Sequence, residues 1–196
     1  MEPATLVERR SFFRTAMGVL LALFVALPRR AAFATNATLT VPIADPSIVV
    51  TKSKRRLQLF SQGSLVKTYR VGLGLSPVED KLRAGDRRTP EGEFYICMKN
   101  SHSQFYLSLE LSYPNQKHAE RGLRDGLITR GQYNRIVSAL ARKRVPLQNT
   151  RLGGELFIHG SGSASDWTWG CVALDNKDIQ ELFNAVPLGT AVTIQH

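Results

Sequence analysis

Cysteine is scarce in this sequence, which has only Cys97 and Cys171 among its 196 residues. So few cysteines exclude a scaffold held together by several disulfides and leave at most one bridge. Cys97 lies in the apolar run Phe94–Met98, where a buried inert thiol is common, whereas Cys171 follows a glycine and a polar loop. These surroundings favour two separate thiols over a disulfide.

Histidine is also sparse, and its spacing gives no metal-binding pattern. The four histidines form no His-x-x-x-His pair, and neither cysteine belongs to a Cys-x-x-Cys group. A structural zinc site needs four such ligands. We therefore expect no metal ion and no other cofactor.

Acidic residues are fewer than basic ones, 16 against 26, and the formal net charge is +10. Residues 1–34 hold five Arg and two Glu, which leaves +7 on the remaining chain. Such a surface attracts anionic polymers, including nucleic acid, anionic lipid and bacterial cell wall. No run of Lys and Arg interleaved with aromatic residues occurs, so nucleic acid is not an expected partner.

No hydrophobic run is long enough to span a membrane as a settled helix. The apolar run Ala16–Leu27 has 12 residues, whereas a membrane-spanning helix needs about 20. This run precedes the small-x-small pattern Ala32-Phe33-Ala34, as in a cleaved export signal, and follows Arg9–Arg14, which resembles a twin-arginine motif. We predict a twin-arginine-like signal peptide at 1–34, export to the periplasm, and a polar linker at 35–46.

Short β-type runs dominate the rest of the chain. The runs 56–60 and 65–73 flank the turn-forming segment Ser61–Ser64 and predict a hairpin. Alternating leucines at 107, 109 and 111 indicate a strand with one buried face. Including these, about seven strands are expected, at 48–50, 56–60, 65–73, 93–98, 105–111, 155–158 and 191–194.

Helical patterns come late in the sequence. The spacing of Thr129 and Gln132 is that of a capping box, and apolar residues follow at helical spacing, which predicts an inserted helix on one side of the sheet. Asp175 is the expected N-cap of a second helix that buries Ile179 and Leu182. The sequence thus predicts a mainly β domain at 47–196, a sandwich or barrel with inserted helices.

One histidine and one cysteine stand beside apolar strand-like runs near the C-terminus. His159 ends the run Glu155–Ile158, and Cys171 begins the run that follows Gly170. A thiol needs a base to become a good nucleophile at neutral pH, because its ordinary pKa of about 8.5 leaves only a few per cent as thiolate. The two residues are therefore candidates for nucleophilic catalysis. The local sequence and the Cys-before-His order of papain-like proteases are absent.

Four motifs in this order resemble the YkuD-type L,D-transpeptidase catalytic domain. They are Gly72-x-Gly74, Gly85-Asp86-x-x-Thr89-Pro90-x-Gly92, His159-Gly160 and Thr168-x-Gly170-Cys171. The resemblance runs from about Ile48 to Ile194.

The resemblance implies a YkuD-like β-sandwich enzyme acting on peptidoglycan stem peptides, with Cys171 as the nucleophile and His159 as its base. The thiol would attack the amide before the terminal D-residue, form an acyl-enzyme and transfer the acyl group to an amine. From the chemistry, backbone N–H groups around Gly170 and Cys171 are expected to stabilise the oxyanion. We assign Gly160, Thr168, Trp169 and Asp166 with Gly170 to oxyanion or substrate binding.

The sequence departs from the commoner family pattern around its cysteine. Thr168 and Trp169 stand where Ser-His is usual, and Ala173 stands where Arg or Asn is usual. The Asp-Trp-Thr-x-Gly-Cys form resembles a branch with wall-directed hydrolases, which leaves a carboxypeptidase or endopeptidase activity open beside transfer. A non-catalytic wall-binding module is a third alternative. An outer-membrane lipoprotein is an expected acceptor or substrate beside stem peptides.

Several neighbouring side chains have open assignments. Without a polar residue at 173, recognition of a substrate carboxylate falls to other candidates, namely Arg87, Arg88 and Arg124. Trp167 and Trp169 either wall the substrate groove or pack the loop. Ser161, Ser163 and Asp166 either orient His159 or are simply small polar loop residues.

Overall fold

The structure is a computed structural model that describes Met1, Leu39 and residues 43–196. The predicted signal peptide and most of the predicted linker therefore lie outside the described residues. Within the described part, no helix is long and apolar enough to cross a membrane.

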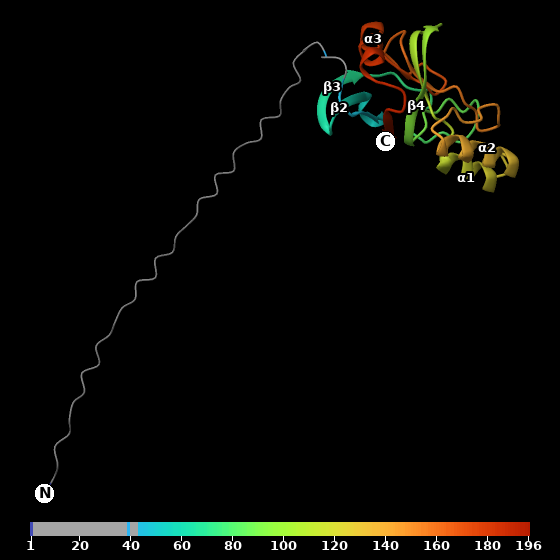
Figure 1. The fold of residues 1–196 in the computed structure, drawn as a ribbon, viewed down its shortest axis with the longest axis horizontal. Helices are drawn as coiled ribbons and strands as arrows, with labels where there is room; N and C mark the ends of the chain where they lie inside the picture. Colours follow the sequence, from blue (N-terminus) through green and yellow to red (C-terminus); the bar gives the residue numbers. More distant parts are fainter. Residues whose placement is uncertain (2–38, 40–42) are drawn as a thin grey trace. The chain divides into compact units, whose positions relative to one another are not determined.

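The described domain is built on one curled sheet of eight strands (Figure 1). Along the sheet the order is β3-β2-β1-β8-β4-β5-β6-β7. The strands are β1 (Pro46–Thr51), β2 (Arg56–Ser61), β3 (Ser64–Arg70), β4 (Gly92–Ser103), β5 (Tyr106–Leu111), β6 (Phe157–His159), β7 (Val172–Ala173) and β8 (Ala191–Gln195). The predicted mainly β class is confirmed. All seven predicted strands are present, and β7 corresponds to the short apolar run that begins at Cys171.

The predicted hairpin is the antiparallel pair β2–β3. Its turn residues Gln62 and Gly63 have positive φ angles of 49° and 75°, which suits the tight connection between two twisted strands. The predicted strand 65–73 ends early, at Arg70. Residues 72–74 instead leave β2 and form isolated bridges to the other end of the sheet, where Gly72 pairs with Ala173 and Gly74 with Thr168. The sheet thus closes on itself beside β7.

The main core fills the interior of this curled sheet. It includes Leu57 and Leu59 of β2, Ile158 of β6 and Val172 of β7, all shielded from solvent. The predicted alternation on β5 is only partly observed, because Ser108 and Glu110 are buried as well as Leu109. Helix α3 packs against β5, and the sheet core, which includes Leu109 and Leu111, also contacts this strand, so little of it faces solvent.

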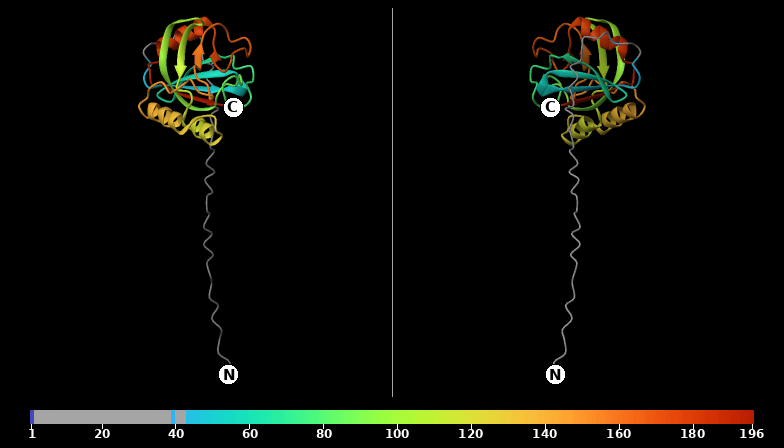
Figure 2. Two further views of the ribbon diagram at one scale, coloured as in Figure 1. Left: turned by 90° about the vertical axis from the view of Figure 1, so that its right-hand side faces the viewer. Right: turned by 90° about the vertical axis from the view of Figure 1, so that its left-hand side faces the viewer.

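Helix α3 (Asn176–Ala185) lies at one end of the curled sheet (Figure 2). Asp175 is its N-cap, as predicted, but the carboxylate makes no capping hydrogen bond. It accepts hydrogen bonds from the amide and hydroxyl of Ser163 at 3.0 and 3.1 Å instead. Ile179 and Leu182 are buried against the sheet core, as predicted.

Helices α1 (Gln116–Arg124) and α2 (Arg130–Ala141) lie together at the opposite end (Figure 1). The sequence predicted α2 but not α1. The two helices pack on each other around a second, smaller core, so the inserted helix does not simply cover a sheet face. This helical cluster contains the buried residues Ala119, Ile128, Ile136 and Leu152.

The predicted capping box at the start of α2 is present. The Thr129 hydroxyl accepts from the Gln132 amide at 3.2 Å, and the Gln132 side chain accepts from the Thr129 amide at 2.9 Å. Thr129→Ala removes one of these bonds and is expected to cost about 1 kcal/mol of unfolding free energy. Urea unfolding followed by circular dichroism measures the loss, with Thr129→Ser as the control that keeps the hydroxyl. Equal stability of the two variants would contradict a contribution of the cap.

Candidate active site

The two candidate catalytic residues lie on neighbouring parallel strands. β6 ends at His159, and Cys171 immediately precedes β7. The register pairs Ile158 with Val172 and His159 with Ala173. Since side chains alternate along a strand, Cys171 projects to the same face as Ala173 and therefore as His159. Pairing of these strands brings together two residues that are 12 positions apart in sequence.

The His159 ring has a fixed orientation and tautomer. The side chain is buried, with 1% exposure, and its Nδ1 donates a hydrogen bond to the Gly160 carbonyl at 2.7 Å. The other nitrogen, Nε2, is then left as the proton acceptor. Phe105 stacks on the ring with centroids 4.6 Å apart, and Trp167 meets it edge-on at 5.5 Å. Burial lowers the pKa of His159, and the hydrogen bond to Gly160 opposes this shift.

Gly160 lies too close to its surroundings to carry a side chain. A Cβ at this position would be 2.6 Å from the Asn176 Oδ1 and 2.8 Å from the Phe105 carbonyl oxygen. The absence of a side chain therefore lets the backbone pass beside β5 while its carbonyl holds His159.

The Cys171 sulfur lies beside Phe157, at the end where the parallel strands β6 and β7 begin. Its Sγ accepts a hydrogen bond from the Phe157 amide at 3.4 Å and is 3.9 Å from the Glu155 carbonyl oxygen. Burial raises the pKa of the thiol to about 11, against the opposing effects of the Phe157 amide and the Lys81 ammonium. No hydrogen bond joins the sulfur to His159 in the described residues. The raised pKa of the thiol and the lowered pKa of the imidazole both favour the neutral forms at neutral pH.

Thr168 and Gly170 shape the turn that precedes the cysteine. The Thr168 hydroxyl donates to the Cys171 carbonyl at 2.8 Å and accepts from the Gly170 amide at 3.1 Å. Gly170 has a φ angle of +130°, and a Cβ there would be 2.7 Å from the Arg88 carbonyl oxygen. Thr168 is thus engaged within the turn, and so is the Gly170 N–H. The Cys171 N–H donates no hydrogen bond within the described residues and remains available to an oxyanion.

Asp166 makes its polar contacts with Arg55 and Leu73 and fixes the loop between His159 and Cys171. Its carboxylate forms an ion pair with Arg55, with oxygen and nitrogen 2.6 Å apart, and accepts from the Leu73 amide at 2.9 Å. Ser163 binds Asp175, and the Ser161 amide donates to the Asn176 side chain at 2.8 Å. These contacts hold the loop to the rest of the domain, and no hydrogen bond connects Asp166, Ser161 or Ser163 to the His159 ring.

The two tryptophans have different surroundings. Trp167 packs edge-on against His159, and its indole N–H donates to the Gly162 carbonyl at 3.0 Å. Trp169 is 66% exposed, and the Arg87 guanidinium lies over its ring at 4.9 Å. Trp167 therefore packs the loop, whereas Trp169 forms part of a groove wall.

A groove of about 980 Å³ opens beside Cys171. Its walls come from the loop around Lys81, the connection between α1 and α2, and the segment 148–156. Two cationic side chains line it, Lys81 and Arg151. We refer to this space as the catalytic groove.

The arginines predicted to bind a carboxylate are placed differently. Arg88 forms an ion pair with Glu79, and its side chain also donates to the Asp80 carbonyl at 3.4 Å. Arg124 is exposed at the end of α1, beside Asp125, and is outside the catalytic groove. Arg87 contacts the ring of Trp169, which lines the catalytic groove, but Arg87 itself is not part of the groove lining. Sequence reasoning did not identify Lys81 or Arg151.

Lys81 is held in a loop that two buried networks fix. Lys52, fully buried, donates to the carbonyls of Glu79 and Thr89 at 2.9 and 3.1 Å and pairs with Glu91 at 2.8 Å. Lys81 itself pairs with Asp86 at 2.7 Å. The Gly85-Asp86 motif marked this loop in the sequence, but no spacing rule indicated that it carries a lysine to the cysteine.

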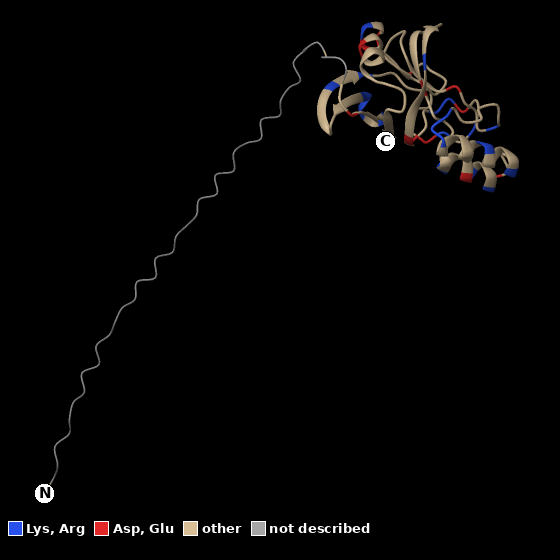
Figure 3. Ribbon diagram, in the orientation of Figure 1, with Lys and Arg blue, Asp and Glu red and all other residues tan. Residues whose placement is uncertain are grey.

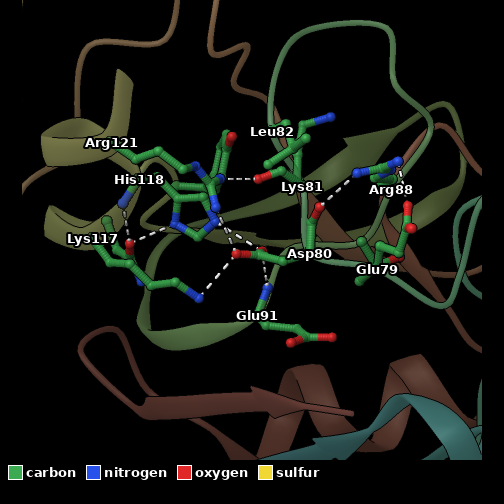
Figure 4. A network of polar contacts seen from close by, with 12 residues as sticks. Glu79, Asp80, Lys81, Leu82, Arg88, Glu91, Lys117, His118 and Arg121 are labelled. Atoms are coloured by element: carbon green, nitrogen blue, oxygen red, sulfur yellow. Dashed lines mark hydrogen bonds and ion pairs between the residues drawn. The ribbon is translucent and has the colours of Figure 1, made fainter. Parts of the chain in front are cut away.

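The second network is centred on Asp80 (Figure 4). Its carboxylate contacts His118 at 3.0 Å, Lys117 at 2.9 Å and Arg121 at 3.1 Å, all on α1, and accepts from the Glu91 amide at 2.8 Å. Burial disfavours the charged form, but these hydrogen bonds and charges outweigh it and hold the pKa of Asp80 well below its ordinary value. Asp80 thereby joins the Lys81 loop to α1.

The second cysteine belongs to a different environment. Cys97 lies on β4, and its thiol donates to the Glu110 carbonyl at 3.5 Å. Burial raises the pKa of Cys97 to about 12, so this thiol is unreactive at neutral pH. Both cysteines are free. In the described part of the chain, no three His, Cys, Asp or Glu side chains gather as a metal site.

Comparison with known proteins connects this geometry to a family. The family model YkuD, the L,D-transpeptidase catalytic domain, matches residues 45–194. No curated protein matches the sequence.

Solved structures of the same fold include the helical cell shape determining protein Pgp2 from Campylobacter jejuni. It is 18% identical with a TM-score of 0.53, and the match covers 83% of this chain and 52% of that one. Bd1075 from Bdellovibrio bacteriovorus is 19% identical with a TM-score of 0.51, covering 78% and 48%. The chain spans about half the length of these structures, and at such identities they show the fold alone. The match over residues 45–194 places this chain in the YkuD family of L,D-transpeptidase catalytic domains.

Proposed function

We propose that this chain is a cysteine-dependent acyltransferase that acts on peptidoglycan stem peptides. The observation that supports it most is the shared face of β6 and β7, which holds Cys171 beside a groove and His159 with a free proton acceptor. Family membership adds the reaction class, L,D-transpeptidation. The groove volume of about 980 Å³ suits a peptide substrate.

The proposed reaction begins with proton transfer from the thiol to His159 Nε2. The sulfur then attacks the carbonyl carbon of the amide before the terminal D-residue, and the Cys171 N–H stabilises the oxyanion. The C–N bond breaks, the leaving amine takes the proton from His159, and a thioester remains on Cys171. An amine of a second stem peptide or of a protein side chain then displaces the sulfur.

The cationic side chains of the catalytic groove serve the anionic stem peptide in this proposal. Lys81 Nζ donates one hydrogen bond, to Asp86, among the described residues, and the ammonium group has three donors. Arg151 lines the same groove. These two cations are the proposed partners of the substrate carboxylate, a role that residue 173 cannot fill because it is alanine.

The cellular setting remains part of the proposal. The RRSFFR segment and the apolar run that follows favour export to the periplasm through a twin-arginine signal, where peptidoglycan is the available substrate. An outer-membrane lipoprotein with an exposed amine is a further acceptor to be tested there.

The role of Cys171 as nucleophile can be tested by product analysis. Incubation of the protein with a disaccharide tetrapeptide is expected to give a thioester on Cys171, release of the terminal D-residue and a cross-linked dimer, all followed by mass spectrometry. Cys171→Ala is expected to abolish all three, whereas Cys97→Ala leaves them intact. Turnover by Cys171→Ala would refute the proposed mechanism. Loss of a residue without dimer formation would instead support a hydrolase, and binding without turnover would support a wall-binding module.

The proposed base predicts how the acylation rate depends on pH. Neutral His159 is the proton acceptor, and burial lowers its pKa below the ordinary value of 6.5. The acylation rate is therefore expected to rise as the pH increases through a midpoint below 6.5, and to stay level until the thiol ionises near its pKa of about 11. Stopped-flow acylation by a carbapenem measures this profile. A midpoint above neutrality would show that thiolate formation, not His159, controls the rate.

The charge of Lys81 is expected to affect the reactivity of the Cys171 thiol. Its positive charge lowers the pKa of the Cys171 thiol, so Lys81→Gln is expected to slow alkylation by iodoacetamide at a given pH. Lys81→Arg retains the charge and is expected to react closer to the wild-type rate. The measurement uses the Cys97→Ala background and thermal unfolding as a check on folding. Equal rates for both folded variants would contradict an electrostatic role.

A further inference from the structure

A concavity of about 320 Å³ lies on the β2–β3 hairpin. Its lining includes Lys54 at the end of the 3₁₀ turn η1 (Lys52–Lys54), Arg56 of β2, and Thr68 and Arg70 of β3. None of its lining residues belongs to the catalytic groove. Figure 3 shows basic positions on β2 and β3, on the side of the domain away from α1 and α2. We refer to this space as the basic pocket.

Two cations of the basic pocket lie directly opposite each other on neighbouring strands. The register pairs Arg56 with Arg70, so their exposed side chains project from the same face of the sheet. The next pair along the hairpin, Leu57 and Tyr69, is buried on the other face. Like charges directly opposite each other destabilise an antiparallel pair. The arrangement is therefore unfavourable by itself and becomes favourable when an anion lies between the two guanidinium groups.

No acidic side chain neutralises these cations within the part of the chain that the structure describes. Lys54 and Arg56 are exposed and form neither an ion pair nor a side-chain hydrogen bond there. The Arg70 guanidinium donates to a neutral acceptor, the Ala164 carbonyl, at 2.9 Å. The basic pocket therefore keeps the positive charge of all three side chains.

A strained turn places two of these cations side by side. Arg55, between Lys54 and Arg56, has a left-handed backbone conformation with φ 48° and ψ 50°, which is uncommon for a residue other than glycine, asparagine or aspartate. Its guanidinium pairs with Asp166 at 2.6 Å and donates to a backbone carbonyl of the 3₁₀ turn at 2.5 Å. These contacts hold the turn, and the turn holds Lys54 at the same pocket as the Arg56–Arg70 pair.

The number and kind of donors favour a phosphate group over a carboxylate. A carboxylate carries one charge and is matched by one guanidinium fork. A phosphate monoester carries about −1.5 to −2 charges at neutral pH and three strong acceptor oxygens. The basic pocket offers the cations Lys54, Arg56 and Arg70, and Thr68 lies two residues before Arg70, on the same face of β3, with a hydroxyl donor.

We propose that the basic pocket binds a phosphate monoester, with Arg56 and Arg70 on either side of the phosphate and Lys54 completing the charge. The ligand is a soluble phosphate ester or the phosphomonoester headgroup of a lipid surface, because both present the same group. The site does not depend on the reaction proposed at Cys171. It adjoins the loop that precedes this cysteine, because Arg70 also contacts Ala164.

The test measures binding of inorganic phosphate to the protein by isothermal titration calorimetry in a phosphate-free buffer. Lys54→Gln/Arg56→Gln is expected to bind at least about tenfold more weakly than the wild type, because it loses two charge-assisted contacts. These side chains have no partner in the described residues, so their removal is not expected to impair folding. The matched control, Arg124→Gln/Arg130→Gln, removes the same charge from exposed positions on α1 and α2 and is expected to keep the wild-type affinity.

Thermal unfolding distinguishes a ligand site from a structural role of Arg56. Without phosphate, Arg56→Gln relieves the repulsion with Arg70, so its Tm is expected to equal or exceed that of the wild type. With saturating phosphate, the wild-type Tm is expected to rise while the Tm of Arg56→Gln stays nearly constant. A lower Tm for Arg56→Gln in both buffers would show that the arginine stabilises the fold and would contradict the proposal.

Sedimentation with vesicles distinguishes the two sources of the phosphate. Binding to phosphatidic acid in phosphatidylcholine, but not to phosphatidylcholine alone, assigns the lipid headgroup if Lys54→Gln/Arg56→Gln abolishes it. Binding of inorganic phosphate without sedimentation assigns a soluble ester. Absence of phosphate binding by the wild type, or an equal loss in Lys54→Gln/Arg56→Gln and in the control, would overturn the site. Neither result would affect the function proposed for Cys171, whose test is the thioester.

Discussion

The site depends on the parallel pairing of two very short strands. β7 consists only of Val172 and Ala173, and its register against β6 decides where the adjacent Cys171 lies relative to His159. So short a strand cannot hold its position through one ladder alone. Ala173 exchanges hydrogen bonds with Gly72 on its other side, at 2.8 and 2.9 Å, and buried side chains pack behind it. Closure of the sheet therefore fixes the position of Cys171.

Burial sets the chemistry of this pair. Removal from water disfavours both a thiolate and an imidazolium, so the resting state has no charged pair to separate. In the proposed reaction, charge develops only when a substrate carbonyl accepts the electrons of sulfur beside the Cys171 N–H. The hydrogen bond from His159 to the Gly160 carbonyl keeps the accepting nitrogen ready for that moment. Rigid backbone around Gly160 and Gly170 supplies this orientation.

Sequence reasoning reached the parts of the molecule that local rules determine. The hairpin turn at Gln62-Gly63, the capping box at Thr129 and the apolar face of α3 follow from neighbouring residues, and the four motifs identified the family. Helix α1 was missed because Gln116–Arg124 is mostly polar, and its ion pairs are with Asp80, in a distant loop. The bond between Arg55 and Asp166 spans 111 positions, and Lys81 reaches the groove across a similar gap in sequence. No periodic pattern in the sequence predicts contacts between residues so far apart in the chain.

The two hydrophobic cores have a thermodynamic consequence for binding. Cys171 packs against the sheet core, whereas the opposite wall of the catalytic groove comes from the connection between α1 and α2, which has its own core. A substrate that contacts both walls stabilises the folded form of both clusters at once. Occupancy of the groove thus couples the local stabilities of the two clusters, in addition to the coupling that the Asp80 contacts with α1 already supply.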